Sequence, residues 1–200
     1  THPELRKAFE ELLGVTVSED GTKTGIIYTD ETGKANQNNT LFNALGKNNL
    51  FIDTIRDTEQ SEKIESIASD NYTDIEDNQS IAAVINAYFE LLPDQSEGQF
   101  DGDSTISRAQ AMTLLMRAIT PVNDQQAPET DSDFTAKVGE TTYTDFAAPM
   151  NDYCYINTSN GLNEKSFEST MSRGEYIYML TKALFGDEYS SRLEEAGKEE

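Results

Sequence analysis

The feature that most constrains the fold of this chain is a segment that occurs twice. Residues 104–119 read STISRAQAMTLLMRAI, and residues 168–184 read ESTMSRGEYIYMLTKAL. Aligned positions keep their chemical character, and Arg108 of the first copy falls on Arg173 of the second. Internal repeats are typical of folds in which small units stack on one another to bury a shared core. We therefore expect repeated helical units in place of one large core.

Both copies begin with the sequence signature of a helix start. A serine, Ser107 or Ser172, stands three residues before Gln110 or Glu175. In such a capping box the serine side chain accepts a hydrogen bond from the amide of the third helical residue, whose own side chain reaches back to the serine amide. Apolar residues then recur at helical spacing in each copy. The predicted helices cover residues 108–120 and 173–185.

A second shared element precedes each predicted helix. The tripeptide Y-T-D with an apolar residue after it occurs at residues 72–75 and again at 143–146. After the first occurrence, apolar residues repeat every three or four positions over residues 81–92, which predicts a helix with one buried face. The predicted units are residues 71–122 and 143–186, joined by a polar linker at 123–142 and followed by an acidic tail at 187–200.

The first seventy residues form an N-terminal helical region in this interpretation. Residues 1–14 look like a capped helix, in which Thr1 and Glu4 form the box, Pro3 is the first helical residue and Gly14 ends it. Two more helices are expected near residues 41–51 and 59–68. A third YTD occurs at residues 28–30, so residues 1–70 are either a degenerate repeat or a region where the tripeptide recurs by chance.

Together these patterns predict a mainly α fold of helical-hairpin repeats packed together, with short extended entry segments and long polar loops. Leu, Ile, Val and Phe together make up 41 of the 200 residues, just above the roughly 20% below which highly charged chains are usually disordered, so only a thin core is possible, which suffices if each unit is small. No run approaches the roughly 18 apolar residues of a membrane helix, so we expect no membrane insertion.

Composition also narrows the function. The chain has 15 basic and 37 acidic residues, a net charge of −22, and this field repels phosphate backbones, so nucleic acid is not an expected partner. His2 and Cys154 are single representatives of their types, which leaves no histidine-based catalytic apparatus and no Cys/His zinc site. The acidic string FDGDS resembles half of a calcium loop, but Ser104 and Gln110 replace its glycine and its bidentate glutamate. We expect no enzyme activity, metal or cofactor.

The two strings of elements resemble the repeat of the S-layer homology (SLH) family of bacterial surface proteins. In the first string the matching elements are YTDI, a helix, Gly98 with Phe100, and ISRAQ; in the second they are YTDF, Gly161 with Phe167, and MSRGE. The chain departs from the family in lacking a Trp after the entry Asp, in Gln110 where Glu is usual, and in Gly174 where Ala is usual.

This resemblance implies an extracellular module, associated with the cell wall or S-layer, that binds wall glycopolymers, often pyruvylated, in grooves between repeats. The ligand-binding positions that it implies are Arg108, Arg173, Gln110, Glu175 and Gly98. A guanidinium at the first turn of a helix, beside amides of positive partial charge, makes a compact site for a carboxylate. Pairing of the arginines with nearby acids is the alternative. A second hypothesis keeps the repeat fold but replaces glycan binding with contacts to other surface proteins.

Overall fold

The computed structural model describes ten stretches of the chain: residues 2–29, 34–36, 40–47, 49–92, 96–119, 136–138, 141–143, 170–174, 176–177 and 180. The chain forms two compact units. The first comprises Thr1–Ser104 with Arg117–Gln126, and the second comprises Thr105–Met116 with Ala127–Glu200. Of the predicted features, Cys154, Gly161, Phe167, Glu175 and the acidic tail lie outside the described residues.

The described part of the chain is mainly helical, which confirms the predicted class. Its α-helices are α1 (Pro3–Leu12), α2 (Leu41–Lys47), α3 (Asn49–Arg56), α4 (Thr58–Asn71), α5 (Ser80–Phe89) and α6 (Arg108–Ile119). Two 3₁₀ turns, η1 (Ile26–Tyr28) and η2 (Asp77–Gln79), accompany them. Two antiparallel pairs join β1 (Thr16–Val17) to β2 (Lys23–Thr24) and β3 (Ala136–Val138) to β4 (Thr141–Tyr143). The arrangement of these helices as SLH repeats stays a prediction.

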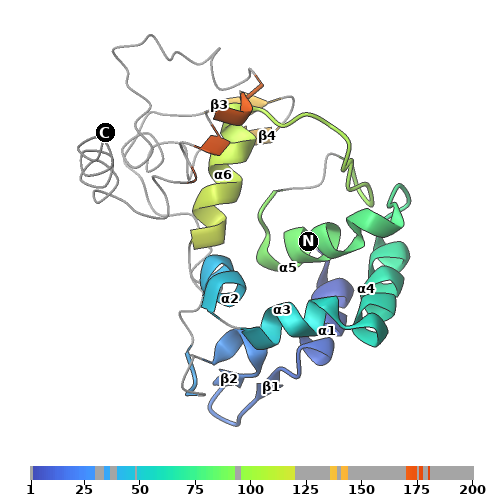
Figure 1. Cartoon of the computed structure of the whole chain (residues 1–200), viewed down its shortest axis with the longest axis vertical. Coiled ribbons are helices and arrows are strands. Elements are labelled where there is room, and N and C mark those ends of the chain that lie inside the picture. The colour runs from blue at the N-terminus through green and yellow to red at the C-terminus, as the bar shows by residue number, and fades with distance from the viewer. Residues whose placement is uncertain are drawn as a thin grey trace, which may run out of the picture. The chain divides into compact units, whose positions relative to one another are not determined.

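The core of the first unit lies where α1, α4 and α5 pack against one another, with α3 against α4 (Figure 1). On α1 and its C-cap the apolar residues recur every four positions, so Leu5, Phe9 and Leu13 face inward and are fully buried. Burying a side chain of this size contributes roughly 1.5–3 kcal/mol to stability. The largest buried side chains that surround them are Ile27, Tyr28, Phe51, Ile64, Tyr88 and Phe89.

A polar network runs through this core. The Tyr28 and Tyr88 hydroxyls lie 3.2 Å apart, and the Tyr88 hydroxyl donates to Glu10 Oε1 at 3.1 Å. Lys23 Nζ donates to the same carboxylate oxygen at 2.9 Å. Burial raises the pKa of Tyr88 well above its ordinary value, with Tyr28 and Glu10 adding to the effect. Tyr88 therefore stays neutral and acts as a hydrogen-bond donor inside the core.

The start of α1 differs from the prediction. The residue that precedes the helix is His2, its side chain makes no capping hydrogen bond, and Pro3 is in the first turn. Thr1 of the predicted box lies outside the described residues, and the helix begins after His2, one residue later than that box requires, while the helix itself and its proline are as expected. At the other end, the backbone turns at Gly14 with φ +65, a conformation that glycine adopts at little cost.

The middle of the first unit holds three helices where two were expected. Residues 41–51 are divided between α2 and α3, and α4 extends beyond the predicted 59–68 at both ends. The Asp57 side chain caps α4 by accepting a hydrogen bond from the Gln60 amide at 3.1 Å. This cap explains why a new helix begins directly after α3.

Helix α5 ends earlier than its apolar pattern predicts. The pattern continues to residue 92, but Glu90 has left-handed backbone angles, φ 50 and ψ 42, and the Leu91 amide turns back to the Asn86 carbonyl at 3.0 Å. The Asn86 side chain then accepts from the Leu92 amide and donates to the Leu92 carbonyl, each at 3.0 Å. The asparagine side chain stabilises the turn before Pro93 is reached.

In the second unit, β3 begins inside the stretch that was expected to be linker. Tyr143 of the second YTD lies in β4, in keeping with the expected extended entry. No described helix is long and apolar enough to cross a lipid bilayer.

Candidate functional site

The predicted capping box at the start of α6 is present. The Ser107 amide donates to Gln110 Oε1 at 2.8 Å, and the Gln110 amide donates to Ser107 Oγ at 3.2 Å. Both residues are only 5% exposed. The entry to α6 is thus a rigid turn, and it places Arg108 in the first turn of a twelve-residue helix.

The second predicted helix starts in the same way as far as the structure describes it. Residues 173, 174, 176, 177 and 180 are helical, and the Tyr176 amide donates to the Ser172 carbonyl at 3.0 Å. The reciprocal half of this box requires Glu175, which lies outside the described residues. The side chain of Tyr176 is half-buried, and this burial raises its pKa.

The two helix entries lie side by side within the second unit. Ser107 and Thr170 form an isolated antiparallel backbone bridge. Arg108 follows Ser107 directly and is half-buried, whereas Arg173 comes three residues after Thr170 and is exposed. The sequence repeat is therefore also a spatial pair, which the spacing of the two motifs along the chain does not predict.

The first YTD holds the loop that precedes α6. The Asp74 carboxylate accepts hydrogen bonds from the Phe100 amide at 2.9 Å and from the Asp101 amide at 2.8 Å, and these bonds lower its pKa. The Thr73 amide donates to the Gly98 carbonyl at 2.9 Å. The buried Tyr72 ring packs edge-on to Phe100, with ring centroids 6.0 Å apart. Each member of the tripeptide therefore contacts the loop.

The acidic loop is held by contacts with the residues around η2. Gln79 Nε2 donates to the Asp103 carboxylate at 3.0 Å, and a side-chain Cβ at Gly102 would lie 2.8 Å from the Gln79 side chain. Among the described residues there is no group of three histidine, cysteine or acidic side chains that could hold a metal ion. The Asp103 carboxylate thus binds a side chain of the protein itself.

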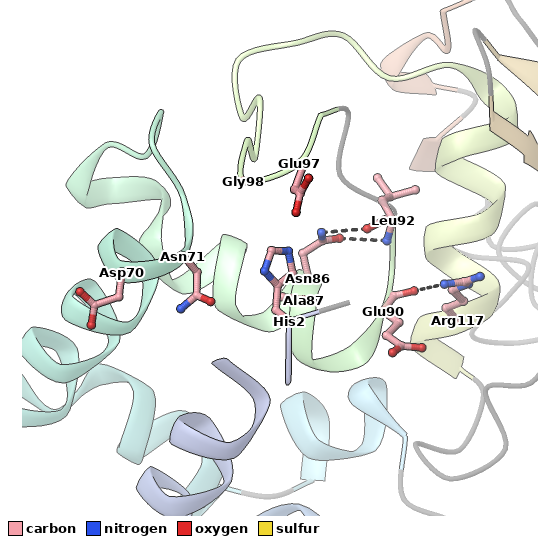
Figure 2. Close-up of a pocket in the computed structure, with 10 residues that line it drawn as sticks. All are labelled: His2, Asp70, Asn71, Asn86, Ala87, Glu90, Leu92, Glu97, Gly98 and Arg117. Carbon is pink, nitrogen blue, oxygen red and sulfur yellow. Dashed lines mark hydrogen bonds between the residues drawn. The ribbon is translucent and has the colours of Figure 1, made fainter. Parts of the chain in front are cut away.

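Gly98, the remaining predicted site residue, belongs to the first unit and lines a pocket there (Figure 2). The pocket has a volume of about 760 Å³, within the roughly 300–1,000 Å³ typical of small-molecule sites. Its walls come from the N-terminus, the ends of α4 and α5, the loop after α5 and the last turn of α6. The lining residues are His2, Asp70, Asn71, Asn86, Ala87, Glu90, Leu92, Glu97, Gly98 and Arg117.

Hydrogen bonds hold much of the pocket wall in place. Figure 2 shows the paired bonds between Asn86 and Leu92, and the Arg117 guanidinium donating to the Glu90 carbonyl. Asn71 Nδ2 donates to the carbonyl of Ile67 at 2.8 Å. The Asn71 bond lies within α4, the Asn86 bonds hold the turn after α5, and the Arg117 bond joins the last turn of α6 to the end of α5.

Sequence reasoning missed this pocket. The sequence features that could have indicated it are polar residues within helical segments, above all Asn86 in the apolar stretch of α5. Such residues are also common on exposed helix faces, so they do not identify a pocket. His2, which lines the pocket, has its ring 4.9 Å from that of Tyr72.

A scan against protein-family models finds no match to the chain, and searches of curated proteins and of solved structures find none either. The resemblance to the SLH family therefore rests on the motifs quoted above.

Proposed function

We propose that this protein is a non-catalytic module of a bacterial cell surface that anchors its parent protein to the wall by binding an anionic, pyruvylated secondary cell-wall polysaccharide. Arg108 and Arg173 are the residues that contact the ligand in this proposal. Its localisation is extracellular, in the cell wall or S-layer. Protein contacts to other surface proteins are the alternative role.

The observation that carries the proposal is the backbone bridge between Ser107 and Thr170. It brings together two helix entries, each with an arginine in its first turn. The first amides of a helix carry positive partial charge, and a guanidinium beside them adds two directed donors that match a carboxylate. Two such entries side by side suit a polymer that presents carboxylates repeatedly along its length.

The role of Gln110 follows from its burial. Gln110 is almost fully buried and bonded to Ser107, so it supports the site by fixing the entry that presents Arg108. The net charge of −22 opposes general adsorption of anionic polymers, so binding of one requires cations placed at a defined position.

The test is sedimentation of the protein with purified walls that have been stripped of protein. We expect the variant Arg108→Ala/Arg173→Ala to lose at least about tenfold in apparent affinity, because charge-assisted hydrogen bonds contribute about 1.5–3 kcal/mol each. The matched control is Lys7→Ala/Arg56→Ala, which removes the same charge from two exposed positions of the first unit and should bind as wild type.

Walls that lack the secondary polysaccharide should not bind either protein. Unchanged sedimentation of the folded arginine variant would contradict the proposed site. Binding to a wall protein together with none to stripped walls would favour the protein-interaction alternative.

A further inference from the structure

Three bonds in the described part of the first unit join an aspartate to a glycine or a serine. They are Asp20–Gly21, Asp101–Gly102 and Asp103–Ser104. At such a bond the backbone nitrogen after the aspartate can attack the side-chain carboxyl carbon and rearrange the main chain, because a small residue hinders the attack least. The reaction requires that the carboxyl and the nitrogen are both free to meet, so hydrogen bonds to either group oppose it.

At Asp20–Gly21 both reacting groups are held. The Asp20 carboxylate accepts hydrogen bonds from the Ser18 hydroxyl and from the Thr22 amide. The Gly21 amide donates to the Ser18 carbonyl at 2.9 Å. The bonds to the carboxylate, that from Ser18 above all, lower the pKa of Asp20 to about 2. Asp20 therefore stays ionised, and the ionised form has no hydroxyl to lose.

At Asp103–Ser104 both groups are engaged as well. The Asp103 carboxylate accepts from Gln79 Nε2 at 3.0 Å. The Ser104 amide donates to the Asp101 carbonyl at 3.2 Å. This bond is thus held by the η2 turn on one side and by its own loop on the other.

Asp101–Gly102 differs from the other two bonds. Among the described residues, neither the Asp101 carboxylate nor the Gly102 amide has a hydrogen-bond or ion-pair partner, and both residues are exposed. Asp101 also has a left-handed backbone, φ 53, which costs free energy for a residue with a side chain. A Cβ at position 102 would lie 2.8 Å from the Gln79 side chain and 2.9 Å from the Phe100 ring, so packing of the loop favours glycine at the reactive position.

We propose that Asp101–Gly102 is a modification site, at which Asp101 converts to isoaspartate through a succinimide formed with Gly102. The Gly102 nitrogen bonds to Asp101 Cγ, and the carboxyl hydroxyl leaves as water with the amide proton. Water then adds to the α-carbonyl carbon of the ring and breaks its bond to the nitrogen. The main chain now continues through Cγ, the α-carboxyl group is free, and no atom has been gained or lost overall.

The rearrangement alters the contacts that hold this loop. The Asp74 carboxylate accepts from the Phe100 and Asp101 amides, and the Asp101 carbonyl accepts from the Ser104 amide. Isoaspartate makes the main chain one methylene longer between these bonds, so they cannot all keep their geometry. The site is therefore a slow covalent release of the loop from Asp74. It lies in the first unit and does not depend on the proposed wall-binding arginines.

The test is incubation of the full chain at neutral pH, followed by proteolytic digestion and mass spectrometry with electron-transfer dissociation, which distinguishes isoaspartate from aspartate at each bond. Isoaspartate should accumulate at residue 101 about tenfold faster than at residue 20, because the groups of Asp20–Gly21 must first lose their hydrogen bonds. Equal rates at the two Asp–Gly bonds of the folded protein would overturn the proposal.

The same chain in urea is the matched control. Unfolding removes the hydrogen bonds of Asp20–Gly21, so the two Asp–Gly bonds should then rearrange at similar rates. A preference for residue 101 that is as large in urea as in the folded chain would assign it to local sequence and overturn the proposal. Ser18→Ala, which removes one bond to Asp20, should raise the rate at residue 20 about threefold and leave that at residue 101 unchanged.

Hydrogen exchange of the Phe100 amide measures the effect on the loop. Protection of this amide should fall as wild-type protein accumulates isoaspartate. Asp101→Glu keeps the charge but lacks the geometry for a five-membered ring, so it should form no isoaspartate at this position and keep its protection over the same time. Unchanged protection in wild-type protein that has rearranged at residue 101 would contradict release of the loop.

Discussion

The helices α1 and α6 both begin at a sequence with the signature of a capping box, but among the described residues a box is formed at α6 alone. At α6 the residues Ser107 and Gln110 satisfy each other's amides with their own side chains. At α1 the position before the helix is held by Pro3 and by the contact of the His2 ring with Tyr72, seventy residues away. One helix start is therefore local and the other depends on tertiary packing, and mutations should separate the two.

The largest effect is expected inside the core that positions α1. Phe9 is fully buried and packs edge-on to Tyr88, with ring centroids 5.2 Å apart. Phe9→Ala should lower the free energy of unfolding by about 3–5 kcal/mol, since it removes a large side chain and leaves a cavity. Urea denaturation followed by far-UV circular dichroism measures this. Leu50→Ala, at a position 65% exposed, should stay within about 0.5 kcal/mol of wild type, and a comparable loss there would contradict the assignment of the core.

The capping box should give an intermediate effect. Ser107→Ala removes the acceptor of the Gln110 amide and should cost about 1 kcal/mol, with earlier loss of hydrogen-exchange protection in the first turn of α6. Glu4→Ala tests the corresponding place on α1. With no box there, only the favourable interaction of a first-turn acid with the helix dipole is lost, about 0.5 kcal/mol. Equal losses at the two helix starts would show that they do not differ as described.

The smallest effect concerns Asp74 and pH. Its hydrogen bonds to two loop amides lower its pKa below the ordinary value of 3.8, so the folded state holds the charged form more strongly than the unfolded state does. The resulting stabilisation is present above the unfolded pKa and is lost as the pH falls through the folded pKa. Asp74→Asn should therefore narrow the stability difference between pH 6 and pH 3.

Melting curves at those two pH values check this prediction. A matched substitution is Asp53→Asn, at an exposed position with no resolved role in the fold, and it should leave the pH dependence as in wild type. A variant at Asp74 with the full wild-type pH dependence would show that the loop amides do not depend on this carboxylate.

Features formed by residues close together in the sequence were predicted, and features that join distant residues were not. The helices α1 and α5 and the start of α6 were predicted, because spacing of three or four residues encodes them, whereas the division of residues 41–51 between α2 and α3 was not. The end of α5 was predicted too late, because an apolar pattern does not reveal that the Asn86 side chain will bond to Leu92.

The candidate sites divide in the same way. The motifs around Arg108 and Arg173 were recognised from the sequence, but not that a backbone bridge would place their entries together. The pocket of Figure 2 left no motif, because its walls come from residues as far apart as His2 and Arg117.

The sequence by itself thus determined that the chain is mainly helical and that α6 begins in a capping box. These properties depend on side chains within a few positions of one another. Only the tertiary structure decided how α1 begins, that Asp74 holds the loop near Phe100, and where the pocket of Figure 2 lies. Those features join groups that are about 25 to more than 100 residues apart, and their proximity is a consequence of packing that no local pattern contains.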